Sequence, residues 1–182
     1  MQSSLCLARV ASPLGKMLVV FDEVGRLRAA DFVDCEDRMR RLLRVQHGDA
    51  VARLRRGSAP PRLRSRLEQY FAGRLAALAS IDVLTTGTEF QLQVWRALRR
   101  IPPGKTLTFA ELAARLGKPR AVRAVGHAAG SNPVCIVIPC HRVIGCDQRL
   151  TGYAGGLDRK RWLLEHEGAL ARASPGTHRA SA

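Results

Sequence analysis

Short apolar runs bounded by turn residues fill the first part of the chain. Three such runs cover residues 4–10, 16–22 and 26–32, and Gly15 and Gly25 lie in the two segments that separate them. Apolar runs rich in β-branched residues between Gly- and Pro-containing turns are typical of strands joined by hairpins. This pattern predicts a three-stranded antiparallel sheet.

The apolar spacing then changes to that of helices. Apolar residues recur three to four positions apart over residues 37–47 and again over 61–71. Pro61 suits the first turn of the second helix, because the missing N–H of proline would have no partner there in any case. The sequence therefore predicts two amphipathic helices that cover the sheet.

An extended linker over residues 80–87 follows. It ends at Thr88, and Gln91 three residues later completes a capping-box pattern that begins another helix. The residues after position 170 are rich in Ala, Ser, Pro and Gly, which predicts disorder. The chain is thus expected to contain an N-terminal α/β domain over 1–86, a second domain over 87–170 and a disordered tail over 171–182.

A second capping box, formed by Thr108 and Glu111, begins a helix that ends at the next glycine. Another helix is expected from position 119 to 130, with Arg120 and Arg123 on a surface otherwise rich in Ala and Gly. Two helices joined by a short glycine-containing turn form a helix-turn-helix. An ordinary αα-hairpin packed inside a domain has the same pattern, so the spacing alone leaves both open.

One cysteine stands beside one histidine at the end of an apolar run. Residues 134–138 predict a buried strand, which Pro139 ends because it has no amide hydrogen for a ladder. A thiol becomes a nucleophile as thiolate, and His141 is a candidate base for Cys140. Neighbouring side chains on a strand point to opposite faces, so the pair can cooperate only if the chain turns after Pro139. The dipeptide alone favours a buried structural cysteine, since free Cys is among the most buried residue types.

Composition places the chain among soluble globular proteins. It has 182 residues, 46% of them hydrophobic, and no apolar run of membrane-spanning length or secretory signal. Its five cysteines are an odd number without paired metal-ligand spacing, which indicates free thiols in a reducing compartment. We therefore expect a cytoplasmic α+β protein.

The formal net charge of +15 indicates a polyanionic partner. Much of the positive charge lies within residues 38–66. The arginine-rich helices there can equally expose these side chains to solvent, because a run of charged residues is as consistent with solubility as with binding.

Several motifs between residues 87 and 170 occur in the order typical of one protein family. They are Gly87-Thr88-Glu89-Phe90, Val94-Trp95, Ile101-Pro102-Pro103-Gly104, the segment 120–126, Ser131-Asn132-Pro133, Pro139-Cys140-His141-Arg142, Gly152-Tyr153-Ala154-Gly155-Gly156 and the segment 162–168. This part of the chain resembles the catalytic domain of the O6-alkylguanine-DNA alkyltransferases, the methylated-DNA–protein-cysteine methyltransferases. The N-terminal half resembles their smaller, more variable domain only loosely.

The resemblance implies a winged-helix-like catalytic domain and a DNA-repair reaction. The family flips an O6-alkylguanine out of the duplex and transfers its alkyl group irreversibly to Cys140, once per molecule. His141 would act as base through a water, Glu167 would orient the imidazole, and Asn132 would tie the helix-turn-helix to the active-site loop. Arg142 would support that loop.

The same resemblance implies how the base is held. Tyr153 would donate a hydrogen bond to N3 of the leaving guanine, and backbone groups of Val143 and Ala154 would recognise its other edges. Phe109 stands where the family usually has a tyrosine whose hydroxyl contacts the phosphate beside the target. We expect the ring still to pack near the flipped nucleotide without that contact.

The partner implied is double-stranded DNA containing O6-alkylguanine, with O4-alkylthymine as a further substrate. Arg123 would fill the gap left by the flipped nucleotide, and Arg120, Thr108 and Ala124 would also contact DNA. We expect a monomer in solution, with cooperative association on DNA left open, and no cofactor. We expect no metal, since Cys6 lacks the Cys and His partners with which some family members bind zinc.

Three other functions remain to be weighed. A lesion-binding module without transfer activity would lack the acceptor, which argues against it because Cys140 is present. A helix-turn-helix regulator would leave the Pro-Cys-His and Tyr-Ala-Gly-Gly segments unexplained. A thiol hydrolase would need an oxyanion hole and a path for water.

Overall fold

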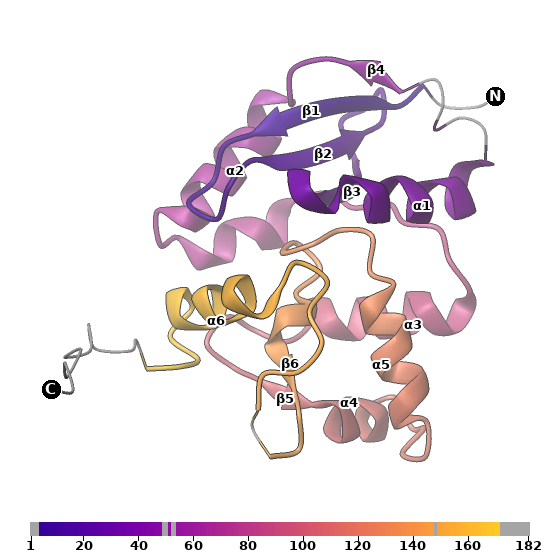
Figure 1. The fold of residues 1–182 in the computed structure, drawn as a ribbon, viewed down its shortest axis with the longest axis vertical. Coiled ribbons are helices and arrows are strands. Elements are labelled where there is room, and N and C mark those ends of the chain that lie inside the picture. Colours follow the sequence, from indigo (N-terminus) through magenta and orange to yellow (C-terminus); the bar gives the residue numbers. More distant parts are fainter. Residues whose placement is uncertain (1–3, 49–50, 52–53, 148, 172–182) are drawn as a thin grey trace, which may run out of the picture.

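The computed structural model describes residues 4–48, 51, 54–147 and 149–171, so all but the first residue of the expected disordered tail lies outside the described residues. Figure 1 shows a small sheet with its helices in the upper part and the C-terminal helices below it. The mixed helix and strand content confirms the α+β class.

The sheet has one strand more than predicted. Strands β1 (Cys6–Val10), β2 (Met17–Phe21) and β3 (Leu27–Phe32) form the expected antiparallel meander. A short strand, β4 (Arg55–Arg56), adds in parallel to β1, giving the order β3-β2-β1-β4. The prediction of three strands was wrong because β4 pairs only through its backbone and its two side chains are exposed, so it leaves no apolar alternation to detect.

Both faces of the sheet are covered, since every residue of β2 and β3 is buried. On one face, Leu18 and Val20 pack with Met39 and Leu43 of α1 (Glu36–His47). On the other face the alternate residues of β2 join the main core with α2 (Pro61–Phe71) and the C-terminal half. Both helices match their predicted ranges to within one residue.

The main core crosses the expected domain boundary. It contains side chains from both halves, including Phe32 and Tyr70 before position 86 and Ile138 and Leu163 after it. Backbone pairing also joins the halves, because Ala30 N donates to Pro133 O at 3.0 Å and Ala30 O accepts from Cys135 N at 2.7 Å. The division into domains stays a prediction.

The C-terminal half consists mainly of helices: α3 (Glu89–Arg99), α4 (Phe109–Arg115), α5 (Val122–Gly130) and α6 (Leu157–His166), with a two-stranded parallel sheet of β5 (Leu107–Thr108) and β6 (Val143–Ile144). Both predicted capping boxes, at Thr88 and Thr108, are confirmed. Helices α4 and α5 form the helix-turn-helix. None of the described helices is long and apolar enough to cross a membrane.

Helix α5 begins later than predicted, at Val122 instead of near Pro119. Gly117, with a φ of 70°, ends α4, and Ala121 N donates to Lys118 O at 2.8 Å to close a separate turn. Arg120 therefore lies in the turn that precedes α5, whereas Arg123 lies on the helix.

The predicted strand over residues 134–138 was wrong, although its burial was right. Only Val134 pairs, in an isolated bridge with Ala30. The chain then turns, with Ile136 at a φ of 70° and Ile138 N donating to Val134 O at 3.0 Å. An apolar run without period 2 indicates burial but cannot distinguish a strand from a buried turn.

Candidate active site

Cys140 begins a short 3-10 helix, Cys140–Arg142, directly after Pro139. Arg142 N donates to Pro139 O at 3.0 Å, so the chain makes the turn that cooperation between Cys140 and His141 requires. The Cys140 side chain is only partly buried, which leaves it open to a reaction partner.

Asn132 holds the turn that presents the cysteine. Its Oδ1 accepts from Val134 N at 2.9 Å, and its Nδ2 donates to Ile138 O at 2.8 Å and to the Cys140 sulfur at 3.3 Å. The side chain thus satisfies two buried backbone groups that a strand ladder would otherwise pair. The same amide reaches the candidate nucleophile.

The surroundings favour the thiolate of Cys140. A hydrogen bond from the Cys135 thiol lowers its pKa, burial opposes this, and Asn132 with the positive charges of Arg38 and Lys160 lowers it further, to about 7. A cysteine with such a pKa is substantially ionised near neutral pH, unlike an ordinary thiol.

His141 and Glu167 form a fully buried pair. The His141 Nε2 atom lies 3.0 Å from Glu167 Oε1. Burial alone would raise the pKa of Glu167, but hydrogen bonds from His141 and Arg142 outweigh it and hold the pKa well below its usual range. Glu167 is therefore a carboxylate.

The charge of Glu167 decides which nitrogen of His141 carries a proton. A carboxylate can only accept hydrogen bonds, so Nε2 must be protonated. Burial lowers the pKa of His141 and favours the neutral ring, whose remaining lone pair then lies on Nδ1. That atom is buried and has no hydrogen-bond partner among the described residues. His141 therefore presents a free basic nitrogen.

Two further residues bind Glu167. Arg142 Nε donates to Oε2 at 2.7 Å and Arg142 Nη2 donates to Oε1 at 2.8 Å. The hydroxyl of Tyr70, on α2, donates to Oε1 at 2.7 Å. The supporting role predicted for Arg142 agrees with these contacts, whereas Tyr70 was not predicted, because no local sequence signal links it to a residue so distant along the chain.

Lys160 is a buried lysine that no pattern in the sequence predicted. Its Nζ donates to Val143 O at 2.6 Å and to Thr151 O at 2.7 Å, so it ties together the two ends of the segment that follows the Cys140 turn. Burial lowers the pKa of Lys160 to about 8. A lysine on an amphipathic helix normally faces solvent, so the sequence offered no sign of this position.

Tyr153 and Val143 lie close to Cys140, whereas Ala154 is exposed. The Tyr153 hydroxyl is 3.1 Å from the Cys135 sulfur, and its ring stands edge-on to His141 with centroids 6.3 Å apart. The Val143 N–H donates to Cys140 O and its carbonyl accepts from Lys160. Both the N–H and the carbonyl of Val143 therefore already have partners within the protein.

Phe109, the first residue of α4, is half-buried and lies beside Gly126 of α5. Its ring therefore packs between the two helices of the helix-turn-helix. Phe109 is therefore part of the helix-turn-helix, and its packing near a flipped nucleotide stays a prediction.

The predicted DNA contacts differ in accessibility. Arg120, Arg123 and Ala124 are exposed. The Thr108 hydroxyl is engaged in its capping box, where it accepts from Glu111 N at 3.1 Å and donates to Glu111 Oε2 at 2.9 Å. Thr108 thus has less capacity for an outside partner than the three exposed residues.

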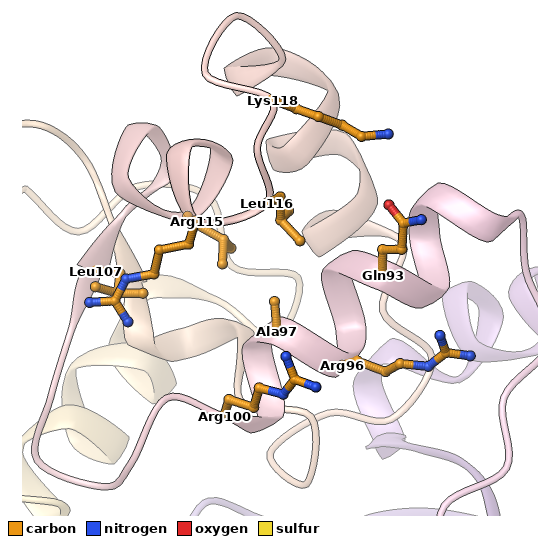
Figure 2. A pocket seen from close by; sticks show the side chains of 9 residues that line it. Gln93, Arg96, Ala97, Arg100, Leu107, Arg115, Leu116 and Lys118 are labelled. Carbon is orange, nitrogen blue, oxygen red and sulfur yellow. The ribbon is translucent and has the colours of Figure 1, made fainter.

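A basic groove of about 570 Å³ lies between α3 and α4 (Figure 2). Four cationic side chains line it: Arg96, Arg100, Arg115 and Lys118. None of the four predicted catalytic residues reaches it. Its charge suits an anion, but it is separate from the chemistry at Cys140.

Among the described residues, no group of three His, Cys, Asp or Glu side chains lies close enough together to hold a metal ion. The site at Cys140 is built instead from a sulfur, an amide, an imidazole and a carboxylate. Such a set can generate a thiolate and move a proton.

Comparisons with known proteins agree with one another. Residues 89–169 match the family model described as 6-O-methylguanine DNA methyltransferase, DNA binding domain. The methylated-DNA–protein-cysteine methyltransferase of Salmonella typhimurium is 49% identical over 162 residues, which cover 89% of this chain and 95% of that protein.

Two solved structures from Mycobacterium tuberculosis have the same fold. The O6-methylguanine methyltransferase of that organism gives a TM-score of 0.75 at 34% identity, over 93% of this chain and 96% of that one. Its protein named OGT, in complex with DNA, gives a TM-score of 0.75 at 34% identity, over 90% of this chain and 92% of that one.

Proposed function

Because this chain belongs to the methylated-DNA–protein-cysteine methyltransferase family, as its 49% identity to a Salmonella typhimurium member over 89% of its length shows, we propose that it repairs O6-alkylguanine in DNA by transferring the alkyl group to Cys140. The observation that carries the choice of residue is the arrangement around that sulfur. The Asn132 amide contacts it at 3.3 Å. The adjacent His141 has a carboxylate on Nε2 and an Nδ1 without a hydrogen-bond partner among the described residues.

The proposed reaction begins with proton transfer. The Cys140 thiol gives its proton to His141 Nδ1 through a water molecule, and Glu167 stabilises the resulting imidazolium. The thiolate attacks the alkyl carbon in line with its bond to guanine O6. The S–C bond forms as the C–O bond breaks, and the released electron pair stays on the guanine.

The leaving guanine must then gain a proton. His141 returns the proton taken from the thiol to the guanine through water, and the Tyr153 hydroxyl donates a hydrogen bond to N3 as negative charge develops. The product at Cys140 is a thioether, which has no carbonyl for water to attack. Each molecule therefore acts once.

DNA binding is assigned to α5. The exposed Arg123 and Ala124 lie on this helix, and the exposed Arg120 precedes it. We propose that α5 enters the minor groove and that Arg123 fills the space vacated by the flipped nucleotide, since a planar guanidinium can stack there. An alkylated guanine pairs poorly, which lowers the cost of flipping it.

The cellular compartment of the protein is inferred from its free cysteines. All five cysteines are free, as a reducing compartment would keep them, and we place the protein in the cytoplasm. We propose that it is a monomer in solution and that an N-terminal domain over 1–86 supports the catalytic domain over 87–170.

The test is intact-protein mass after incubation with duplex DNA containing O6-methylguanine. One added methyl group, located on Cys140 by peptide mapping, is expected. Cys140→Ser should gain no mass while retaining DNA affinity, because phosphate contacts dominate affinity. A lesion-binding module or a hydrolase would leave the wild-type mass unchanged, and full transfer by Cys140→Ser would exclude the proposed acceptor.

A further inference from the structure

Arg159, on α6, joins the N-terminal half to residues 152–156, which we call the Tyr153 loop. Its Nη1 donates to Asp34 Oδ2 at 2.8 Å and to Gly155 O at 3.0 Å, and its Nε donates to Leu14 O at 3.2 Å. Leu14 precedes β2 and Asp34 follows β3. One guanidinium therefore connects two segments of the N-terminal half to the loop.

The same guanidinium lies over an aromatic ring. Arg159 Cζ is 4.0 Å from the centroid of the Phe32 ring, a distance at which a cation is attracted to the face of the ring. The Arg159 side chain is 22% exposed, so solvent screens its contacts only in part. The planar group is thus held in one orientation by its three acceptors and by Phe32.

The Tyr153 loop packs against the same ring. A Cβ atom added to Gly155 would lie 3.2 Å from Phe32 Cε2 and 2.8 Å from Tyr153 Cε1, so the backbone at Gly155 lies against both rings. Gly156 N donates to Tyr153 O at 3.0 Å and closes a turn within the loop. The carbonyl that Arg159 binds therefore belongs to the residue against which the Tyr153 ring packs.

A further contact ties the loop to the segment after β3, since the Cys35 thiol donates to Ala154 O at 3.6 Å. The far end of the Tyr153 side chain reaches the active site. Its hydroxyl lies 3.1 Å from the Cys135 sulfur, and its ring stands edge-on to His141. Tyr153 thus extends from a loop held by the N-terminal half to the site of the reaction.

We propose, on the basis of the function proposed above, that Arg159 is a positioning residue that orients Tyr153 for hydrogen bonding to N3 of the leaving guanine. Three of the five residues of the Tyr153 loop are glycine, so the loop has many accessible conformations unless other contacts hold it. A donor that is already oriented needs no reorganisation when charge develops. Through Arg159, the N-terminal half takes part in the departure of the base.

The test is a double-mutant cycle between Arg159 and the Tyr153 hydroxyl. Single-turnover methyl transfer from O6-methylguanine duplex is measured at saturating protein for wild type, Arg159→Met, Tyr153→Phe and the double variant. The matched control, Arg161→Met, removes the same charge from an exposed position of α6. Iodoacetamide alkylation of Cys140 is measured on the same samples, because that reaction has no leaving guanine.

Tyr153→Phe should slow transfer about tenfold or more, because a hydrogen bond to a developing charge is lost. Arg159→Met should slow it about three- to tenfold in the presence of the Tyr153 hydroxyl and less than about twofold in its absence, since residues that act together are not additive. The iodoacetamide rates of Arg159→Met and all rates of Arg161→Met should equal those of wild type.

Arg159→Lys provides the same comparison in a variant that keeps the charge and most of the side chain. Its single ammonium group cannot serve three acceptors in the geometry of a guanidinium. It should therefore show the same dependence on the Tyr153 hydroxyl with a smaller loss, and it replaces Arg159→Met in the cycle if that variant does not fold.

Equal losses on replacing Arg159 with and without the Tyr153 hydroxyl would overturn the proposal, because Arg159 would then act independently of that group. A parallel fall in the iodoacetamide rate would also contradict it, since the whole site would be disturbed. If wild type transferred no methyl group while iodoacetamide still alkylated Cys140, the proposed function itself would fail, and the role of Arg159 with it.

Discussion

Tyr70 donates a 2.7 Å hydrogen bond to Glu167, although the two residues are 97 positions apart in the sequence. Tyr70 lies on α2 beside the sheet, and Glu167 directly follows α6. The N-terminal half therefore reaches the carboxylate that orients the proposed base. Burial and the neighbouring negative charge of Glu167 hold the pKa of Tyr70 far above its usual value, so the hydroxyl remains a donor.

Tyr70→Phe should destabilise the protein without destroying its fold. The ring stays in the core, but a buried hydrogen bond to a charged group is lost, which costs about 1.5–3 kcal/mol. Urea denaturation followed by circular dichroism measures the change. A variant as stable as wild type would mean that the contact contributes nothing.

Lys160→Met should change how stability depends on pH. The folded pKa of Lys160 is about 8, below the roughly 10.4 of an unfolded lysine. Between these values the unfolded state binds more protons, so this group makes stability rise with pH and then level off. The difference in unfolding free energy, wild type minus variant, should therefore increase from about pH 8 to about pH 10.4. A difference that is flat across this window would show that Lys160 is charged throughout.

Arg123→Ala should separate base flipping from chemistry. Duplex substrate should react more slowly because only the duplex needs a flipped state, whereas a free alkylated base should react almost normally. Single-turnover rates on the two substrates provide the measurement. Equal slowing on both would place Arg123 in the chemical step.

Phe109→Tyr adds a hydroxyl to a ring that packs near Gly126. We expect the duplex reaction to speed up or stay unchanged, and the free-base reaction to stay unchanged, because the added group lies on the helix-turn-helix. Single-turnover rates of wild type and variant on duplex DNA and on free base measure the effect. A large loss on duplex DNA would mean that the pocket has no room for the oxygen.

The salt dependence of DNA binding should locate the docking surface. Each neutralised phosphate contributes a slope of about 0.9 on a log-log plot of affinity against salt. Replacing Arg120 and Arg123 by Gln should lower the slope measured by fluorescence anisotropy. The matched control replaces Arg55 and Arg56, which are exposed on β4, and should change it little. If the slope fell only when Arg55 and Arg56 were replaced, the DNA-binding surface would lie on the N-terminal half instead.

Much of the local structure was determined by the sequence alone. The three meander strands, α1, α2 and the two capping boxes were predicted within about one or two residues, because apolar period, turn residues and caps act over a few positions. The order of short motifs around Cys140 also indicated the family and the candidate residues. Those signals lie within contiguous segments.

Tertiary structure alone decided the rest. The strand β4 exists because the edge of β1 offers backbone partners, and residues 134–138 form a turn because Asn132 replaces their ladder partners. Tyr70 and Lys160 become part of the site only where distant segments meet. Contacts between segments far apart in the sequence produce no periodic pattern of apolar residues. Only the folded chain could therefore show which groups donate hydrogen bonds to Glu167 and Cys140.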